Sequence, residues 1–492
     1  MRVKVFFSAF SIMIMIMIMA TTDLFSDPRD IIVDWSFYYG GADNEEAHSI
    51  IPVDGGGYIV AGYTESYGYG EYSKPDIWLL KLDQYGEVEW DHTYGADDSL
   101  DIAYSVIQTA DGGYILAGER METFGFGGGD AIILKVDASG TQEWLKRYGG
   151  NDGDMVRFIS ETEDGGYIAC GVTRSYGAGW IDGWVLKIDA DGNEEWNALF
   201  GGDEYEVIKA IYQTEDGGYI AAGYTSSQGA GGNDIWLLKL DSDGVMEWET
   251  LYGGPGRDRA YFLNKTNDNN YILTGEFDVN GEGDLIVMKV DPMGNILWQQ
   301  TYDKAADDEG HYIEQTTDNG YIVAAWAGYQ GNPWTQMWAL KLDEEGQLIW
   351  DGVYGGPASD AAHVVRKTPD HGFIVGGMTL SDGAGRVDMW LMKFIDDEIS
   401  IEENNVLDSG SQLNCYPNPF KSSLTIEYPL VDRSAEIGIY NISGQMIKTI
   451  PLNGDPVVWD GKDRSGNAAA SGLYFIIPGQ RSDLAKKVVL IR

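Results

Sequence analysis

The chain has 492 residues, including 65 Gly, 16 Trp, 30 Tyr and 15 Phe, and carries a formal net charge of -45. So negative a charge repels phosphate backbones and anionic lipid, which argues against a nucleic-acid-binding function. Long runs rich in Leu, Ala, Glu and Lys are absent, so we expect many short strands joined by glycine turns rather than helices.

The first twenty residues have the pattern of a secretory signal. Arg2 and Lys4 precede an apolar run over residues 5–20, which is shorter than a membrane-spanning helix requires. We interpret residues 1–20 as a cleaved signal peptide, with an uncleaved N-terminal anchor as the alternative. No later segment is a transmembrane candidate. Cys170 and Cys415 lie in different predicted modules, so no disulfide framework is expected.

A repeat of about 52 residues covers residues 32–396. A turn of the type Asp-Gly-Gly-Tyr occurs seven times, at intervals of 56, 53, 52, 52, 50 and 52 residues. The aromatic residues that end these turns are Tyr58, Tyr114, Tyr167, Tyr219, Tyr271, Tyr321 and Phe373. A tryptophan opens each unit, at Trp35, Trp90, Trp144, Trp196, Trp248, Trp298 and Trp350. Seven copies of one unit indicate a repeat architecture.

Each unit predicts four strands, which we call A to D. Strand A holds the tryptophan, strand B is a short apolar run, strand C follows the Asp-Gly-Gly turn, and strand D is apolar on both faces. Seven such units predict an all-β, seven-bladed β-propeller, with the tryptophans packed between neighbouring blades. The first strand A, around Trp35, has no strand D before it, and the last strand D, around Trp390, has no strand A after it. These two strands should pair and close the ring.

The turns and loops divide between the two faces of the predicted ring. The B–C and D–A turns are short and share one face. The A–B and C–D loops share the other face and are longer and more variable, so this is the expected recognition face.

Acidic residues in these connections admit two interpretations. The stretch Asp-Ser-Asp-Gly at 241–244 resembles a calcium loop, but only its first Asp and last Gly persist between copies, which favours a plain turn. The acids of the A–B and C–D loops either accept hydrogen bonds from loop backbones or form a face that coordinates a cation such as calcium. They are Asp43, Asp98, Asp154, Asp203, Asp258, Asp308 and Asp360, with Asp76, Asp130, Asp182, Asp234, Asp284 and Asp388 before strand D.

Departures from the repeat are the better candidates for a ligand site. Trp334 and Gln336 stand where other copies have Gly and Asp, and several other C–D loops carry aromatic residues. Those aromatic candidates are Tyr67, Tyr69, Tyr72, Phe124, Phe126, Tyr176 and Trp180. Exposed aromatic residues suit contact with a sugar or a peptide. The five histidines show no metal-ligand spacing and no catalytic motif is present, so no catalytic residue and no cofactor other than calcium is expected.

The end of the chain predicts a second, smaller module. Residues 397–411 are acidic and polar, as in an exposed linker, and residues 412–492 alternate short strands with Asp-Gly turns, as in a small β-sandwich. In order and spacing this segment resembles the C-terminal sorting domain of type IX secretion cargo, which is similar to the immunoglobulin-like domain of flagellar hook-capping proteins. Matching positions include Tyr416, Pro417, Asn418, Pro419, Phe420, Tyr440, Gly444, Trp459, Asp460, Gly461, Gly466, Ser471, Gly472, Tyr474, Lys486 and Lys487. Pro478 departs from the pattern because it interrupts a strand that is usually regular.

The propeller repeat has its own resemblances. Its Leu-Asp-x-x-Gly-x-x-x-Trp element resembles the repeat of pyrroloquinoline-quinone propellers, which usually have eight blades, so we take it as similarity in blade packing without a quinone. The whole unit looks like the propeller repeats of exported bacterial proteins. The resemblances imply export by the signal peptide and then by the type IX machinery, to the medium or the cell surface.

The expected function follows from these modules. We expect a secreted or cell-surface, monomeric, non-catalytic protein that binds a glycan or protein ligand or serves a structural role. The alternative is an exported hydrolase or lyase acting on glycans through acids on the A–B and C–D loop face. An enzyme should carry acids unique to one or two blades around the axis, whereas a scaffold should show them evenly.

Overall fold

The structure is a computed structural model that describes residues 31–53, 56–68, 74–96, 99–121, 128–304, 306–329 and 332–396 of the repeat region. In the C-terminal region it describes residues 414–416, 423–427, 436–441, 446–451, 456–464, 466–469, 472–478 and 486–490. The predicted signal peptide and linker lie outside these ranges. The chain divides into two units, Met1–Asp397 and Glu398–Arg492.

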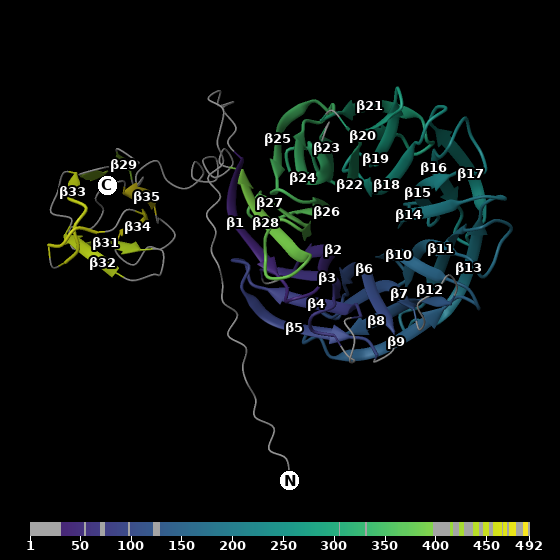
Figure 1. Cartoon of the computed structure of the whole chain (residues 1–492), viewed down its shortest axis with the longest axis horizontal. Helices are drawn as coiled ribbons and strands as arrows, with labels where there is room; N and C mark the ends of the chain where they lie inside the picture. Colours follow the sequence, from purple (N-terminus) through teal and green to yellow (C-terminus); the bar gives the residue numbers. More distant parts are fainter. Residues whose placement is uncertain are drawn as a thin grey trace, which may run out of the picture. The chain divides into compact units, whose positions relative to one another are not determined.

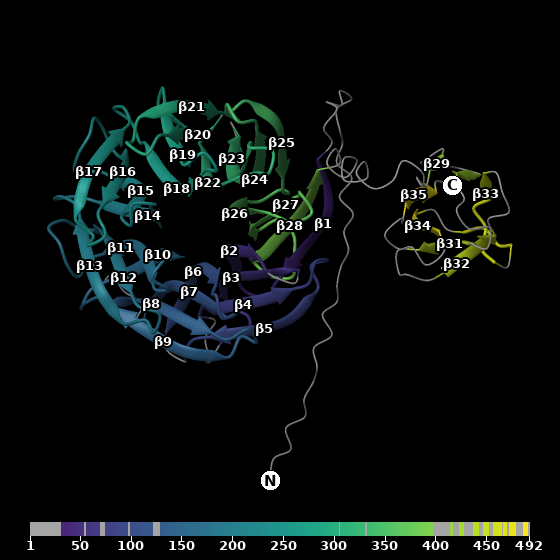
Figure 2. The same ribbon diagram turned by 180° about the vertical axis from the view of Figure 1, so that it is seen from behind.

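Seven four-stranded antiparallel sheets form a ring in the first unit (Figure 1, and from behind in Figure 2). Within each sheet the hydrogen-bonded order is B, C, D, A, with strand B at the centre of the ring and strand A at its rim. The predicted seven-bladed propeller is therefore confirmed.

The blades follow the chain around the ring. Blade 1 contains β2 (Glu45–Pro52), β3 (Tyr58–Thr64), β4 (Asp76–Leu82) and β5 (Val88–Tyr94), and blade 2 contains β6 (Leu100–Gln108), β7 (Tyr114–Met121), β8 (Gly129–Val136) and β9 (Gln142–Tyr148). Blade 3 contains β10 (Asp154–Glu161), β11 (Tyr167–Thr173), β12 (Asp182–Ile188) and β13 (Glu194–Phe200), and blade 4 contains β14 (Glu206–Gln213), β15 (Tyr219–Thr225), β16 (Asp234–Leu240) and β17 (Met246–Tyr252). Blade 5 contains β18 (Arg259–Lys265), β19 (Tyr271–Val279), β20 (Glu282–Val290) and β21 (Ile296–Tyr302), and blade 6 contains β22 (Asp308–Gln315), β23 (Tyr321–Tyr329), β24 (Asn332–Leu342) and β25 (Leu348–Tyr354).

The seventh blade closes the ring with both ends of the repeat region. It contains β26 (Asp360–Lys367), β27 (Phe373–Thr379), β28 (Asp388–Asp396) and, on its outer side, β1 (Ile31–Tyr39). β1 pairs antiparallel with β28, from Ile31 opposite Asp396 to Tyr39 opposite Met389. The pairing predicted from the two unpartnered strands is confirmed, and it joins the two ends of the repeat region.

The repeated tryptophans pack between neighbouring blades, as predicted. Trp35, on the rim of blade 7, lies 6.0 Å from Tyr58 of blade 1, and the same kind of contact recurs around the ring at 5.6–6.4 Å. A tyrosine near the end of strand A adds a hydrogen bond: the hydroxyl of Tyr39 donates to the carbonyl of Gly86 at 2.6 Å, and four other blades repeat this bond. Each blade is thus fastened to the next at the rim.

The recurring turn residues build the blades. The Asp of the B–C turn forms an ion pair with the buried lysine of strand D at 2.7–3.0 Å in blades 2 to 7, and Asp54 of blade 1 lies outside the described residues. Asp241 of the Asp-Ser-Asp-Gly stretch accepts the amides of Asp243 and Val245, and Gly244 has a φ of 79°, which favours glycine. The plain-turn interpretation of this stretch is therefore confirmed.

The second unit contains two small antiparallel sheets. One has the order β29 (Asn414–Tyr416), β30 (Leu424–Glu427), β33 (Val457–Trp459), and the other has the order β32 (Met446–Pro451), β31 (Glu436–Asn441), β34 (Gly472–Pro478), β35 (Lys486–Leu490). Trp459 is fully buried and packs edge-on against Tyr474, with ring centroids 5.0 Å apart. Pro478 is the last described residue of β34 and lies opposite Ile437 of β31.

Candidate functional site

A cavity of about 510 Å³ lies on the axis of the ring, and we call it the axial cavity. Its lining comes from the inner strands of all seven blades, namely β2, β6, β10, β14, β18, β22 and β26. Cavities of this size commonly hold small ligands in proteins.

The most prominent lining residues occupy the same position in every blade. Each inner strand contains one β-bulge, where a single residue is left without a partner on strand C. A bulge re-aims the side chain of its extra residue, and here every one of these residues lines the axial cavity. The seven residues, in blade order, are His48, Tyr104, Arg157, Lys209, Tyr261, His311 and His363. We call them the bulge ring.

The bulge ring is chemically asymmetric, whereas the residues that build the blades recur around the ring. Histidines come from blades 6, 7 and 1, and the two cations come from blades 3 and 4. Two residues before the bulge, blades 1 and 6 carry Glu46 and Glu309, whereas blades 2, 3, 4 and 7 carry apolar residues there. Acids at this position are therefore restricted to two blades, which is the distribution that we expected of an enzyme.

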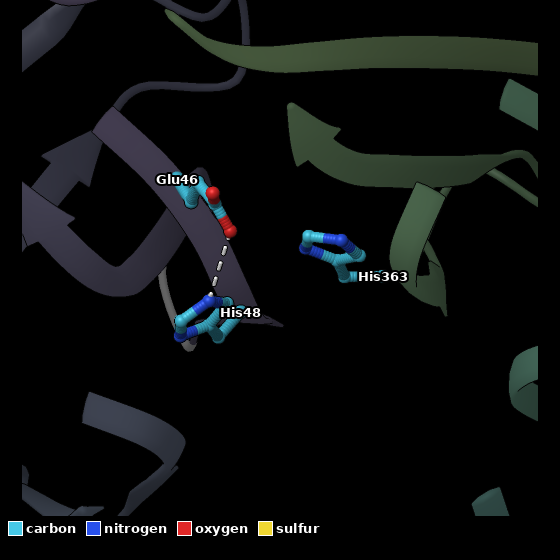
Figure 3. A group of neighbouring side chains, drawn as sticks. All are labelled: Glu46, His48 and His363. Atoms are coloured by element: carbon cyan, nitrogen blue, oxygen red, sulfur yellow. Dashed lines mark hydrogen bonds and ion pairs between the residues drawn. The ribbon is translucent and has the colours of Figure 1, made fainter. Parts of the chain in front are cut away.

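Glu46, His48 and His363 form a group on one side of the axial cavity (Figure 3). Glu46 and His48 lie on β2, and His363 faces them from β26 of the neighbouring blade. The potential ligand atoms of the three side chains all lie within 4.8 Å of one another. The histidines show no metal-ligand spacing along the sequence. The fold nevertheless brings two of them together with Glu46, because it places the first and last blades side by side.

Hydrogen bonds hold both imidazoles in the same orientation. His48 Nδ1 lies 2.9 Å from the carbonyl oxygen of Ala103, and His363 Nδ1 lies 3.1 Å from that of Ala47. Because a carbonyl only accepts, each Nδ1 carries a proton and donates it to the next blade. Nε2 of His48 then faces the carboxylate of Glu46, 3.3 Å from its Oε2.

The surroundings set the charges of this group. Burial alone would raise the pKa of Glu46, but the close contact with His48 and the proximity of His363 outweigh it and lower the pKa to about 2. Burial lowers the pKa of His363 to about 4, against the opposing effect of Glu46. At neutral pH the group therefore contains a carboxylate and a neutral imidazole.

The opposite side of the bulge ring is cationic. The guanidinium of Arg157 lies 4.2 Å from the ring centroid of Tyr104, and the ammonium of Lys209 lies 5.3 Å from that of Tyr261. Neither has a carboxylate within ion-pair distance among the described residues. Burial, together with repulsion from Arg157, lowers the pKa of Lys209 to about 7, against the attraction of Glu309.

Aromatic side chains occupy the axis next to the bulge ring, toward the B–C turns. Phe158 packs against Tyr212 and Phe262, with centroids 5.1 Å and 5.5 Å apart, and Phe262 stacks on Tyr312 at 3.8 Å. These contacts link blades 3 to 6, and they give the cavity an apolar end beside its polar ring.

The acids of the loop face mostly accept backbone hydrogen bonds. The first acid of the inner strand accepts an amide of the preceding A–B loop at 2.6–2.9 Å in six blades: Glu45, Asp154, Glu206, Asp258, Asp308 and Asp360. In blades 1 and 4 Glu45 and Glu206 accept this bond, two and three residues after Asp43 and Asp203, and Asp98 lies outside the described residues. Within the described ranges these acids form no group with metal-ligand geometry.

Two of the predicted aromatic candidates brace the loops. The hydroxyl of Tyr67 donates to the carbonyl of Gly40 at 2.7 Å, and that of Tyr176 donates to Gly149 at 2.9 Å. The two residues occupy equivalent positions in blades 1 and 3. In each blade the tyrosine hydrogen bond joins the C–D loop to the adjoining A–B loop. Both side chains nevertheless remain about half exposed.

The other candidates do not form one patch. Trp180 is 69% exposed and stacks on Tyr205 in blade 3, whereas Trp334 is 45% exposed in blade 6. Gln336 is buried, and its amide donates to the carbonyls of Thr335 and Ala358. Tyr69, Tyr72, Phe124 and Phe126 lie outside the described residues.

A signal for the bulge ring does exist in the sequence. Each of its members lies ten residues before the aromatic residue that ends the Asp-Gly-Gly turn, as His48 does before Tyr58. In every copy this position holds a bulky His, Tyr, Arg or Lys within an otherwise largely apolar strand. Comparing the copies at that position would have found the site that the loops did not reveal.

Comparison with protein families identifies the second unit. Residues 414–491 match the secretion system C-terminal sorting domain. Within it Trp459 and Tyr474 are core residues, Gly461 has a φ of 66° and Lys486 is exposed, whereas Pro417, Asn418, Pro419 and Phe420 lie outside the described residues. The chain is therefore a seven-bladed β-propeller exported by a type IX secretion system through its C-terminal sorting domain, to the outer surface or beyond.

Solved structures resemble the chain at low sequence identity. A surface component of the type IX secretion system of Porphyromonas gingivalis, PorZ, is 13% identical with a TM-score of 0.43, covering 92% of this chain and 60% of that one. The extracellular domain of a hybrid two-component system from B. thetaiotaomicron is 10% identical with a TM-score of 0.43, covering 95% and 60%. Sqt1 from Chaetomium thermophilum is 10% identical with a TM-score of 0.42, covering 75% and 100%. The chain thus spans about 60% of the length of the first two.

No curated protein matches the chain. Among the described residues, no helix is long and apolar enough to cross a membrane. Both cysteines are free.

Proposed function

We propose that this protein is a non-catalytic binding protein of the cell surface or medium that takes a small acidic saccharide into its axial cavity. The bulge ring is the observation that carries the proposal. Residues that build the blades recur in nearly every copy, whereas the bulge ring varies from blade to blade while keeping one position and one direction. Variation of that kind within a strict repeat is expected of a site that recognises one asymmetric ligand.

The chemistry of the cavity favours an anionic ligand with flat faces. Arg157 and Lys209 sit beside each other in blades 3 and 4, in a protein whose overall charge is strongly negative. A carboxylate that enters the cavity would therefore meet the cations in a largely desolvated setting. Tyr104 and Tyr261 provide ring faces of the kind on which sugars stack.

Calorimetric titration with an oligogalacturonate and with a neutral oligosaccharide of equal length tests this proposal. We expect binding of the acidic oligosaccharide alone, at one site per chain. Arg157→Gln should weaken it by about 10- to 100-fold, the usual effect of removing a charged hydrogen-bond donor. The matched control is Arg386→Gln, which removes one positive charge from an exposed loop outside the cavity and should leave affinity unchanged.

Two outcomes would contradict the proposal. One is equal binding of the acidic and neutral oligosaccharides, or binding of neither oligosaccharide. The other is saccharide binding that Arg157→Gln leaves intact and that Trp180→Ala or Trp334→Ala removes, because that would place recognition on the loop face.

Glu46 and Glu309 favour a second candidate function, an exported lyase or hydrolase of acidic glycans. These two acids precede the bulge in only two blades, next to three imidazoles that could move protons. Incubation with polygalacturonate, followed by ultraviolet absorbance of unsaturated products and by assay of new reducing ends, separates the two functions. Turnover that Glu46→Gln abolishes would establish the enzyme, and binding without turnover would establish the binding protein.

A further inference from the structure

We propose that Glu46, His48 and His363 bind one divalent transition-metal ion of the zinc type at the wall of the axial cavity. The inference goes beyond saccharide binding and does not depend on it. Two imidazole nitrogens and one carboxylate oxygen are a recurring set of protein ligands for such an ion, with further coordination positions left for water or a ligand.

The hydrogen bonds of the two histidines prepare them as ligands. Nδ1 of His48 and Nδ1 of His363 each donate to a backbone carbonyl of the next blade, at 2.9 Å and 3.1 Å. Metal-binding histidines are typically held in this way, because the bond fixes the tautomer and leaves the lone pair of Nε2 available. The two histidines occupy equivalent positions in adjacent blades, so the repeat places the same hydrogen bond in both blades.

The contact between His48 and Glu46 calls for a cation. With Nδ1 as the donor, Nε2 of His48 and Oε2 of Glu46 face each other at 3.3 Å as two groups of acceptor character. Only a shared proton or a metal ion makes such a contact favourable. Two ligands bound at about 2.0–2.1 Å to a tetrahedral ion lie about 3.3–3.4 Å apart, which agrees with this separation. His363 completes the group, within the 4.8 Å that encloses all three ligand atoms.

A neighbouring imidazole repeats part of this arrangement. His311 lies in the same bulge ring, with its ring centroid 5.9 Å from that of His363. Its Nε2 lies 3.4 Å from Oε2 of Glu309, as Nε2 of His48 lies beside Glu46 in blade 1. The proposed ion site therefore consists of Glu46, His48 and His363, the three residues whose ligand atoms lie together.

The ligand types decide the class of ion. Calcium and magnesium prefer oxygen ligands alone, so two imidazoles favour zinc, cobalt, nickel, copper or iron in the divalent state. The calcium expected on the loop face would have to be a separate ion.

The test uses the full secreted chain, stripped with a chelator and titrated with Zn²⁺ alone in a calorimeter. We expect one tight equivalent per chain, with weaker binding at the many surface acids appearing only at higher concentration. His48→Ala and His363→Ala should each lower the affinity of that equivalent at least tenfold. The control is His92→Gln, an exposed histidine of β5 outside the cavity, which should leave it unchanged.

Two further measurements keep the test decisive. Glu46→Gln preserves the side-chain shape and should also weaken the site, so failure of an alanine variant to fold does not end the experiment. Loading with Co²⁺ should give visible bands of four- or five-coordinate cobalt that disappear in His363→Ala. Absence of a tight equivalent, or a tight equivalent that survives all three substitutions, would overturn the proposal. Because no saccharide is present, these results are independent of the proposed function.

Discussion

At the scale of single residues, some positions of the repeat keep the same residue in every blade, whereas others keep only their place in the fold. The lysine of strand D and the aspartate of the B–C turn recur because each pair fastens a blade. The bulge-ring position also recurs, but only its geometry is kept, and its chemistry changes from His48 to Arg157 to Lys209. A residue that can vary without loss of the blade is available for function.

Lys209 gives a prediction about pH. Its pKa of about 7 in the folded protein lies well below the ordinary value of a lysine, 10.5, so between these values the unfolded chain binds more protons. The contribution of this group to stability therefore increases as pH rises from about 7 toward 10. Lys209→Met should raise the midpoint of thermal unfolding by about 2–4 °C at pH 6, with the gain shrinking by pH 9.

Thermal unfolding followed by circular dichroism at pH 6 and pH 9 measures this effect. The matched control is Lys367→Met, whose side chain on β26 is 45% exposed and should show no such dependence. The groups that surround Lys209 are Arg157, Arg259, Glu309 and Cys170. A loss of stability in Lys209→Met at both pH values would contradict the assignment of an unfavourably buried ammonium.

At the scale of the structural element, most of the blade could be predicted from the sequence. The tryptophan of strand A, the Asp-Gly-Gly turn and the apolar strand D each have one physical role, and their order sets the sheet order and the closure by β1. These signals are local, because each turn or strand is specified by residues close to it in the chain.

The site could not be predicted in the same way. Its residues sit at bulges, and one extra residue in strand B shifts the alternation of inward and outward side chains, so simple period-two patterning misplaces them. The approach of His363 to His48 arises only after seven blades have closed into a ring. The variable loops instead suggested Trp180 and Trp334 as ligand-binding residues, and these lie three blades apart.

β1 gives a prediction about closure. Deleting residues 30–41 should destabilise the entire ring, because it leaves the outer edge of β28 unpaired and removes Trp35 from its packing against Tyr58. We expect loss of amide hydrogen-exchange protection in blade 4, far from the deletion along the chain, as well as in blade 7. Ile32→Thr, at an exposed position of β1, should leave protection unchanged. Protection that persists in β15 while β27 loses it would show that the blades unfold separately.

At the scale of the whole molecule, the two units have different roles: the sorting domain serves export, and the propeller contains the proposed binding site. The sorting domain has its own core, in which Trp459 and Tyr474 pack together, and its match extends over residues 414–491. Its removal should therefore change where the protein is found without changing what the propeller binds.

A fusion tests that division. A periplasmic reporter that carries residues 411–492 at its C-terminus should reach the cell surface or the medium in a host with a type IX secretion system. The same fusion truncated before residue 472 lacks β34 and β35, so its sheet cannot form and it should stay in the periplasm. Equal retention of both fusions would contradict independent sorting by this domain, and both should be measured by cell fractionation and surface protease digestion.

The order of β28 and the sorting domain along the chain provides a form of quality control. The strand that completes the ring ends at Asp396, and the matched sorting segment begins at residue 414. Synthesis that stops anywhere in the propeller removes both, whereas synthesis that reaches the sorting segment has already supplied every blade. A chain broken off during translation therefore lacks the sorting domain, and we expect incomplete rings with unpaired strand edges not to reach the cell surface.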